Sequence, residues 1–219
     1  MPAPPVLCGR RTRRSPPGRL ERADRGRISE PSCLVRPVDV KVRTVEQEIA
    51  RLATGAQGVA ARAELLEAGI TRQEIAHRIR IGALIVEFRG VYRMGHRAPS
   101  VEARYLAAVK ACGAGARLSG LAAAHLLGLV RGAVPPPEVT APTERRVRGV
   151  KTHRSRTMDP RDGTRWRGIP VTTVPRTLVE LSSVLSLDAL ARAFHEAGIR
   201  HRTTPAQVEA ALERPGSRS

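Results

Sequence analysis

Four side chains able to recognise nucleic acid occur together in the segment TRQEIAHRIR, residues 71–80. They are Arg72, Gln73, His77 and Arg80. An arginine can form two hydrogen bonds with a guanine and a glutamine can form two with an adenine, so Arg80 and Gln73 fit base edges in the major groove of DNA. Arg72, in the first turn of the expected helix, is better placed for a phosphate. The alternative interpretation of each residue taken alone is a solvated helix face.

The spacing of apolar residues indicates how a helix would present these side chains. At 100° per residue, Ile75 and Ile79 share one side, which we expect to face the core. The polar side chains fall roughly opposite, at Gln73, His77 and Arg80. The spacing therefore predicts one polar face pointing away from the protein interior.

The start of this helix carries a complete capping signal. Thr71 is a good N-cap residue, and Glu74 three residues later predicts a capping box. Ile70 can pack against Ile75 as a hydrophobic staple. Together these features predict a fixed angle where the helix leaves the turn at Gly69.

Two shorter helix patterns precede the capped segment. The apolar spacing of Val45, Ile49 and Leu52 predicts a first helix to about residue 53. The run ARAELLEAG predicts a second helix that stops at its final glycine.

Two strand-like runs, ALIVEF and GVYRM, follow the capped segment. The glycine between them can adopt the positive φ of a tight turn. Helix, turn, capped helix and hairpin predict a winged helix-turn-helix over residues 44–97, whose second motif helix would enter the major groove. The wing residues Arg89 and Arg93 would then reach phosphate or the minor groove.

Residues 98–219 predict a second region that mixes helices and strands, so we expect an α+β chain. The helix patterns are SVEARYLAAVKACG, SGLAAAHLLGL, VPRTLVELSSVL, SLDALARAFHEAG and TTPAQVEAALER, and the strand patterns are PEVTAP and VKTHRS. Between the strands, Arg145, Arg146 and Arg148 form a basic turn. This turn is a candidate for a second phosphate contact, and a solvated loop is the alternative.

Residues 1–43 are rich in proline and arginine and have no apolar periodicity, which predicts a disordered tail. A basic arm that grips phosphates is the functional interpretation. The alternatives are a passive tail or a translation start nearer Val40 or Val42.

The charge balance favours a polyanionic partner. The chain has 38 Lys and Arg against 20 Asp and Glu, a net charge of +18. Residues 1–43 hold eleven basic and four acidic residues, and residues 144–168 hold nine and three, so these two segments contribute +7 and +6. A codon bias toward arginine would exchange lysine for arginine but would not remove acidic residues.

Several other classes of protein fit the sequence poorly. The three cysteines share no CxxC spacing, and HEAGIRH does not place two histidines one helical turn apart, so no metal site is expected. We find no nucleophile elbow or acid-x-Lys nuclease core and expect neither an enzyme nor a cofactor. Five aromatic residues are too few for a base-stacking platform. The apolar run 118–130 is shorter than the about 20 residues that span a bilayer, and no secretory signal is present, so a cytoplasmic protein without a membrane partner is expected.

The segment AARAELLEAGITRQEIAHRIRIGALIVEFRGVYRMG resembles the N-terminal winged helix of the AbiEi antitoxin family. In that family the wing typically reads RGVY, which matches residues 89–92. The similarity continues through RYLAAV, VKTHRS and especially GIPVTTVPRTL, and it covers roughly residues 44–200.

The resemblance implies a repressor that binds DNA at its own promoter and opposes a nucleotidyltransferase-like toxin encoded beside it. In such a type IV system the toxin and antitoxin need not bind one another. Many relatives continue into a Vsr-like nuclease domain, which is not found before Ser219.

The leading hypothesis is a sequence-specific double-stranded-DNA-binding regulator that acts as a monomer or dimer, on inverted repeats if two copies bind. The alternative is a protein-interaction module that neutralises a nucleotidyltransferase-type toxin or docks another partner. A third interpretation is a degenerate relative of the nuclease fusions that retains only the DNA-docking part.

Overall fold

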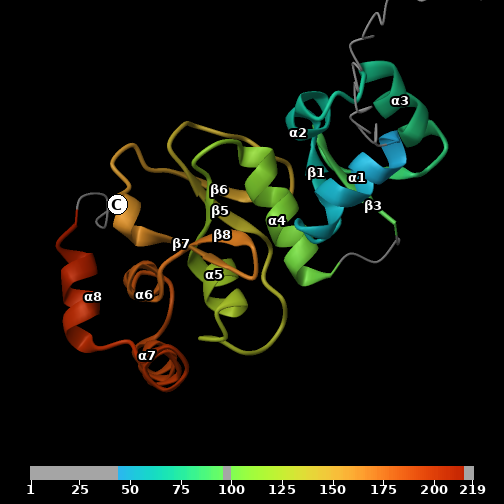
Figure 1. Cartoon of the computed structure of the whole chain (residues 1–219). Coiled ribbons are helices and arrows are strands. Elements are labelled where there is room, and N and C mark those ends of the chain that lie inside the picture. The colour runs from blue at the N-terminus through green and yellow to red at the C-terminus, as the bar shows by residue number, and fades with distance from the viewer. Residues whose placement is uncertain (1–43, 96–99, 215–219) are drawn as a thin grey trace, which may run out of the picture. The chain divides into compact units, whose positions relative to one another are not determined.

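The computed structural model of the chain describes residues 44–95 and 100–214 (Figure 1). Both stretches contain helices and strands, so the predicted α+β class is confirmed. The predicted tail, residues 1–43, lies outside the described residues, and so does the predicted boundary between residues 97 and 98. In the described part of the chain, no helix is both long and apolar enough to cross a membrane.

The first described stretch contains three helices and three strands. They are α1 (Val45–Thr54), β1 (Val59–Ala61), α2 (Arg62–Glu67), α3 (Arg72–Arg80), β2 (Leu84–Phe88) and β3 (Val91–Met94). The strands form an antiparallel sheet in the order β1-β3-β2. The three predicted helices and the predicted hairpin are all present, whereas β1 was not predicted.

A hydrophobic cluster fixes α3 against this sheet. Ile75 of α3 packs in one cluster with Ile70, Leu65, Leu84 and Tyr92, and all five are at most 5% exposed. Burying an apolar side chain of this size contributes about 1.5–3 kcal/mol. The side of α3 that carries Ile75 is therefore held in the interior, as its spacing predicted.

The second described stretch contains the remaining elements. They are α4 (Val101–Cys112), β4 (Arg117–Leu118), α5 (Gly120–Leu126), β5 (Glu138–Ala141), β6 (Lys151–Arg154), the 3₁₀ helix η1 (Pro160–Asp162), β7 (Gly163–Trp166), β8 (Ile169–Thr172), α6 (Val174–Leu181), α7 (Leu187–His201) and α8 (Pro205–Leu212). All five predicted helices and both predicted strands are present.

The strands of this stretch form one mixed sheet in the order β6-β5-β4-β8-β7. β5 runs parallel to β6 and β4 runs parallel to β8, while the other two pairs are antiparallel. Leu118, Val139, Ile169 and Val171 are fully buried where the sheet meets the covering helices. Of the five strands, β4, β7 and β8 were not predicted.

Helix α4 joins hydrophobic clusters on two sides. Ala103 and Ala107 pack with Val59 of β1, while the remaining buried residues of α4 belong to the large cluster around the five-stranded sheet. Hydrogen bonds stabilise the same contact: Lys110 Nζ donates to Glu64 Oε2 at 2.6 Å and to the carbonyl oxygen of Val59 at 3.0 Å. The small alanines allow the helix to approach β1 closely.

Candidate nucleic-acid interface

The predicted capping box at the start of α3 is present. The Glu74 amide donates to Thr71 Oγ1 at 3.2 Å, and the Thr71 amide donates to Glu74 Oε2 at 2.8 Å. The Thr71 hydroxyl and backbone amide, which both donate to Glu74, lower the pKa of its carboxyl. The only carboxylate within α3 is therefore ionised and held at the cap, where it also complements the helix dipole.

Four polar side chains of α3 are exposed to solvent. Arg72, Gln73, His77 and Arg80 are all exposed. Among the described residues, none of these four side chains makes a hydrogen bond or an ion pair. Ala76, which is also exposed and small, lies between Gln73 and Arg80 on this face. The face therefore presents unused donors and acceptors that a ligand could contact.

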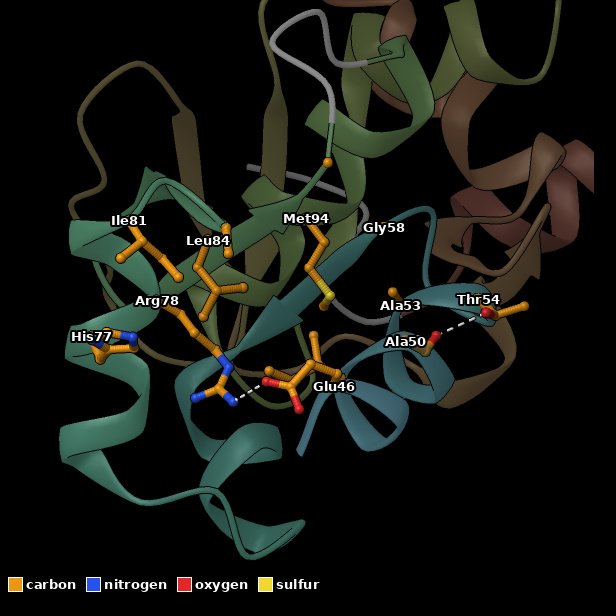
Figure 2. Close-up of a pocket in the computed structure, with 13 residues that line it drawn as sticks. Glu46, Ala50, Ala53, Thr54, Gly58, His77, Arg78, Ile81, Leu84 and Met94 are labelled. Carbon is orange, nitrogen blue, oxygen red and sulfur yellow. Dashed lines mark hydrogen bonds and ion pairs between the residues drawn. The ribbon is translucent and has the colours of Figure 1, made fainter. Parts of the chain in front are cut away.

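A different arginine anchors α3. Arg78 Nη2 lies 2.5 Å from Glu46 Oε1 of α1, and Nη1 donates to the carbonyl oxygen of Glu74 at 3.1 Å. Figure 2 shows the two charged groups meeting between the helices. The pKa of Glu46 is lowered by a hydrogen bond from its own backbone amide and by the Arg78 guanidinium. Beside this pair lies a groove of about 850 Å³ with a largely apolar lining that includes Leu84 and Met94 of the hairpin.

The two predicted wing arginines have different positions. Arg89 is exposed at the hairpin tip, next to Gly90, whose φ of +77° allows the tight turn. Arg93 is only 6% exposed, and its Nε lies 3.3 Å from Glu87 Oε2. The predicted phosphate contact of Arg93 is therefore wrong for this structure, because the guanidinium is turned inward. Arg93 shares its side of β3 with Val91, which packs against Ala103 and Ala107 of α4, and Val59 of β1 lies directly beside it.

The structure brings the tip of the β2–β3 hairpin and the basic turn into one depression, which we call the basic groove. It has a volume of about 640 Å³ and is lined by Val86, Glu87, Phe88, Arg89, Ala111, Glu144, Arg145, Arg146, Val147 and Arg148. Arg145, Arg146 and Arg148 are exposed, as is Arg89. The groove thus gathers four arginines against two glutamates.

Little within the groove neutralises these arginines. Glu87 is already paired with Arg93, and Arg146 lies 3.4 Å from Glu144 with both side chains strongly exposed, a geometry that contributes little. Within the described chain, Arg89 and Arg148 have no hydrogen-bonded or ion-paired partner. The sequence identified each arginine but contained no signal that the two segments lie together.

Sequence reasoning also missed a polar cluster around Glu138 of β5. Its Oε1 accepts hydrogen bonds from Lys151 Nζ at 2.9 Å and His153 Nε2 at 2.7 Å, and its Oε2 accepts from the Leu121 amide at 3.2 Å. Gly120 beside it adopts φ +55°, and a Cβ there would lie 2.4 Å from Glu138 Cδ. These contacts saturate the carboxylate and fix α5 to the sheet, which indicates a structural role.

Glu180 completes this cluster. One of its oxygens accepts from the Gly120 amide at 2.9 Å, and the other accepts from Arg176 Nε at 3.0 Å. Burial raises the pKa of the Glu180 carboxyl. Because both oxygens already have partners, this carboxyl also supports the fold.

The described residues form neither a metal-binding group nor a reactive thiol site. No group of three or more histidine, cysteine, aspartate or glutamate side chains in residues 44–95 and 100–214 could hold a metal ion. His201 instead contacts the carbonyl oxygen of Leu127 through Nε2 at 2.8 Å. Cys112 is buried, and burial raises the pKa of its thiol, which disfavours the reactive thiolate.

Comparison with known proteins adds no relative, because no protein-family model matches the sequence and no curated protein matches it significantly. The free face of α3 and the basic groove are therefore the features on which a functional argument can be built.

Proposed function

We propose that the chain is a sequence-specific regulator that binds double-stranded DNA through a winged helix-turn-helix formed by residues 44–97. One observation carries this proposal. The outward face of α3 holds Gln73, His77 and Arg80, and Arg72 is exposed at the helix start. None of the four has a partner in the described chain, while the side of the helix that carries Ile75 is buried. Such a face, on a helix that follows a turn and precedes a hairpin, is the arrangement that reads the major groove.

In this proposal some of the side chains contact bases and the others contact phosphates. Arg80 contacts a guanine and Gln73 an adenine, with His77 beside them. Arg72 at the helix start and Arg89 at the wing tip hold phosphates.

The basic groove extends the phosphate contact beyond the wing. Arg145, Arg146 and Arg148 lie with Arg89 around one depression, and phosphates are the groups that a concave cluster of guanidinium groups binds best. Arg93 is left out of the interface because it is buried.

The resemblance to AbiEi antitoxins supports a narrower proposal. It implies that the operator lies in the chain's own upstream region and that a nucleotidyltransferase-like toxin is a genetic partner. Neither statement requires the two proteins to touch.

The test is a gel-shift titration of the full chain against its own upstream DNA, with random duplex as competitor, at two salt concentrations. We expect a preference for the upstream fragment at both salts. Arg80→Ala should reduce that preference by about 1–3 kcal/mol, while Arg89→Ala should weaken binding to both DNAs alike. Arg192→Ala is the matched control, because it removes one exposed charge from α7, outside the interface.

Two results would contradict the proposal. Equal loss of binding to both DNAs in Arg80→Ala would remove the base-reading role of that residue. The same affinity for upstream and random DNA at both salts would favour the alternative, a module that neutralises or docks a protein partner, which copurification would detect.

A further inference from the structure

Helix α7 exposes a row of apolar and small residues, which we call the α7 stripe. The row consists of Leu187, Ala191, Phe194 and Gly198, spaced so that they lie within about 60° of one another around the helix. All four are exposed, and the exposed fraction is 82% for Leu187 and 38% for Phe194. Scattered apolar residues are normal on a surface, but a continuous row over three turns marks a contact face.

The stripe is not needed to hold α7 in place. Ala193 and Ala197 lie on another side of the helix and are buried in the large hydrophobic cluster. The Ser186 hydroxyl caps the first turn by accepting from the Ala189 amide at 3.4 Å. The helix is thus anchored through one side and leaves the stripe uncovered by the described chain.

The charge of this part of the molecule indicates what can approach it. Residues 174–213 contain four arginines and five acidic residues, a net charge of −1, although the whole chain carries +18. A segment with this charge does not attract DNA electrostatically. A second copy of this chain can meet the first along α7 without bringing two strongly basic helices together.

The order of side-chain sizes along the stripe fits a copy of itself. Large and small residues alternate as Leu, Ala, Phe and Gly. If two α7 helices cross antiparallel about a twofold axis, Leu187 lies opposite Gly198 of the second copy, and Ala191 lies opposite Phe194. Every large side chain then meets a small one, so facing positions interdigitate and the twofold axis repeats each pair. A parallel arrangement would instead oppose Leu187 to Leu187.

We propose that this chain forms a twofold-symmetric homodimer through antiparallel pairing of the α7 stripe. The same pairing brings Val184, which is 52% exposed, toward His201 of the second copy. There Trp166 packs edge-on against the His201 ring at a centroid distance of 5.2 Å, and its side chain is 37% exposed. One helix with these additions is smaller than the about 800 Å² per partner of a standard interface, so we expect a dissociation constant in the micromolar range, about 1 μM or weaker.

Sedimentation equilibrium of the full chain without DNA tests the proposal. The wild type should show reversible association toward twice the monomer mass. Leu187→Glu should raise the dissociation constant by about tenfold or more, because it places a charge in an apolar contact. Ile199→Glu is the matched control: Ile199 is 66% exposed on the same helix but lies off the stripe, so its change should have little effect. A monomer at every concentration, or equal effects of the two variants, would overturn the proposal.

A size exchange tests the antiparallel pairing itself. Ala191→Phe alone should weaken the dimer, because it opposes Phe to Phe194 of the second copy. Adding Phe194→Ala to it restores one large and one small residue in each pair and should bring association back to within a few-fold of the wild type. Failure of this rescue, with both variants folded by circular dichroism, would reject the pairing.

This inference does not rest on the proposed DNA binding. The sedimentation experiment contains no DNA, and the gel shift with Arg80→Ala leaves the α7 stripe intact. A dimer that does not bind DNA and a DNA-binding monomer would therefore be distinguished.

Discussion

Helices α3 and α7 each bury one side in a hydrophobic cluster and expose another, but they expose opposite chemistry. The outward face of α3 is polar and carries Gln73, His77 and Arg80, which have no hydrogen-bonded or ion-paired partner among the described residues. Helix α7 instead exposes the α7 stripe of apolar and small residues, and its segment has no net positive charge. The difference shows that the net charge of +18 is distributed unevenly along the chain. It also shows that two amphipathic helices of one protein can suit two different kinds of partner.

Salt should affect the two faces in opposite directions, and this is the largest effect we expect. Five phosphate contacts, by Arg72, Arg89 and the three arginines of the basic turn, would make DNA affinity fall by roughly 500-fold between about 50 and about 200 mM salt. Self-association through α7 should strengthen with salt, because ions screen the repulsion between two copies that each carry +18. Fluorescence anisotropy with labelled DNA and sedimentation without DNA measure the two trends. If both interactions weaken alike, the contrast between the helices is wrong.

The two hairpin arginines should separate binding from stability. Arg93→Ala removes the buried partner of Glu87, so we expect the free energy of unfolding to fall by about 2 kcal/mol, measured by urea denaturation. The DNA affinity of the folded protein should change little. Arg89→Ala is the matched comparison, because this exposed residue should lower affinity and leave unfolding unchanged. If Arg93→Ala lowered the DNA affinity and Arg89→Ala did not, Arg93 would belong to the DNA interface.

Removing the two helix caps should give the smallest effects. Thr71→Ala and Ser186→Ala should each lower the free energy of unfolding by about 1 kcal/mol, because each hydroxyl accepts a hydrogen bond from a first-turn amide. Binding assays should then distinguish the two variants. Loss of the α3 cap should weaken DNA binding, and loss of the α7 cap should weaken self-association. Equal effects of both variants in both assays would indicate general destabilisation only.

The local features of the fold could be predicted from the sequence because their signals are local. Thr71, Glu74 and Gly69 define the start of α3 within a few residues, and the spacing of Ile75 and Ile79 identifies its buried side. Gln73, His77 and Arg80 lie on the opposite, exposed side as expected, and Arg72 is exposed in the first turn.

The missed features depend on contacts between distant segments. Strands β1 and β4 have three and two residues, too few for a periodic pattern, and β1, β4, β7 and β8 all form where a partner strand lies beside them. The error on Arg93 has this origin, because both β1 and the distant helix α4 lie against its side of β3. A two-stranded wing leaves that side chain near an edge, whereas β1 makes β3 the central strand. The basic groove likewise depends on where the chain places Arg145 beside Arg89.

The anchoring of α3 has a consequence for how such a protein could change over generations. The groups that hold the helix, Thr71, Ile75 and Arg78, all lie off its outward face. If that face reads DNA, exchanges at Gln73 or Arg80 alter the preferred sequence without disturbing the residues that fold the helix. Descendants of one such regulator could therefore diverge in target while keeping the same scaffold, and a designer could retarget it by the same exchanges.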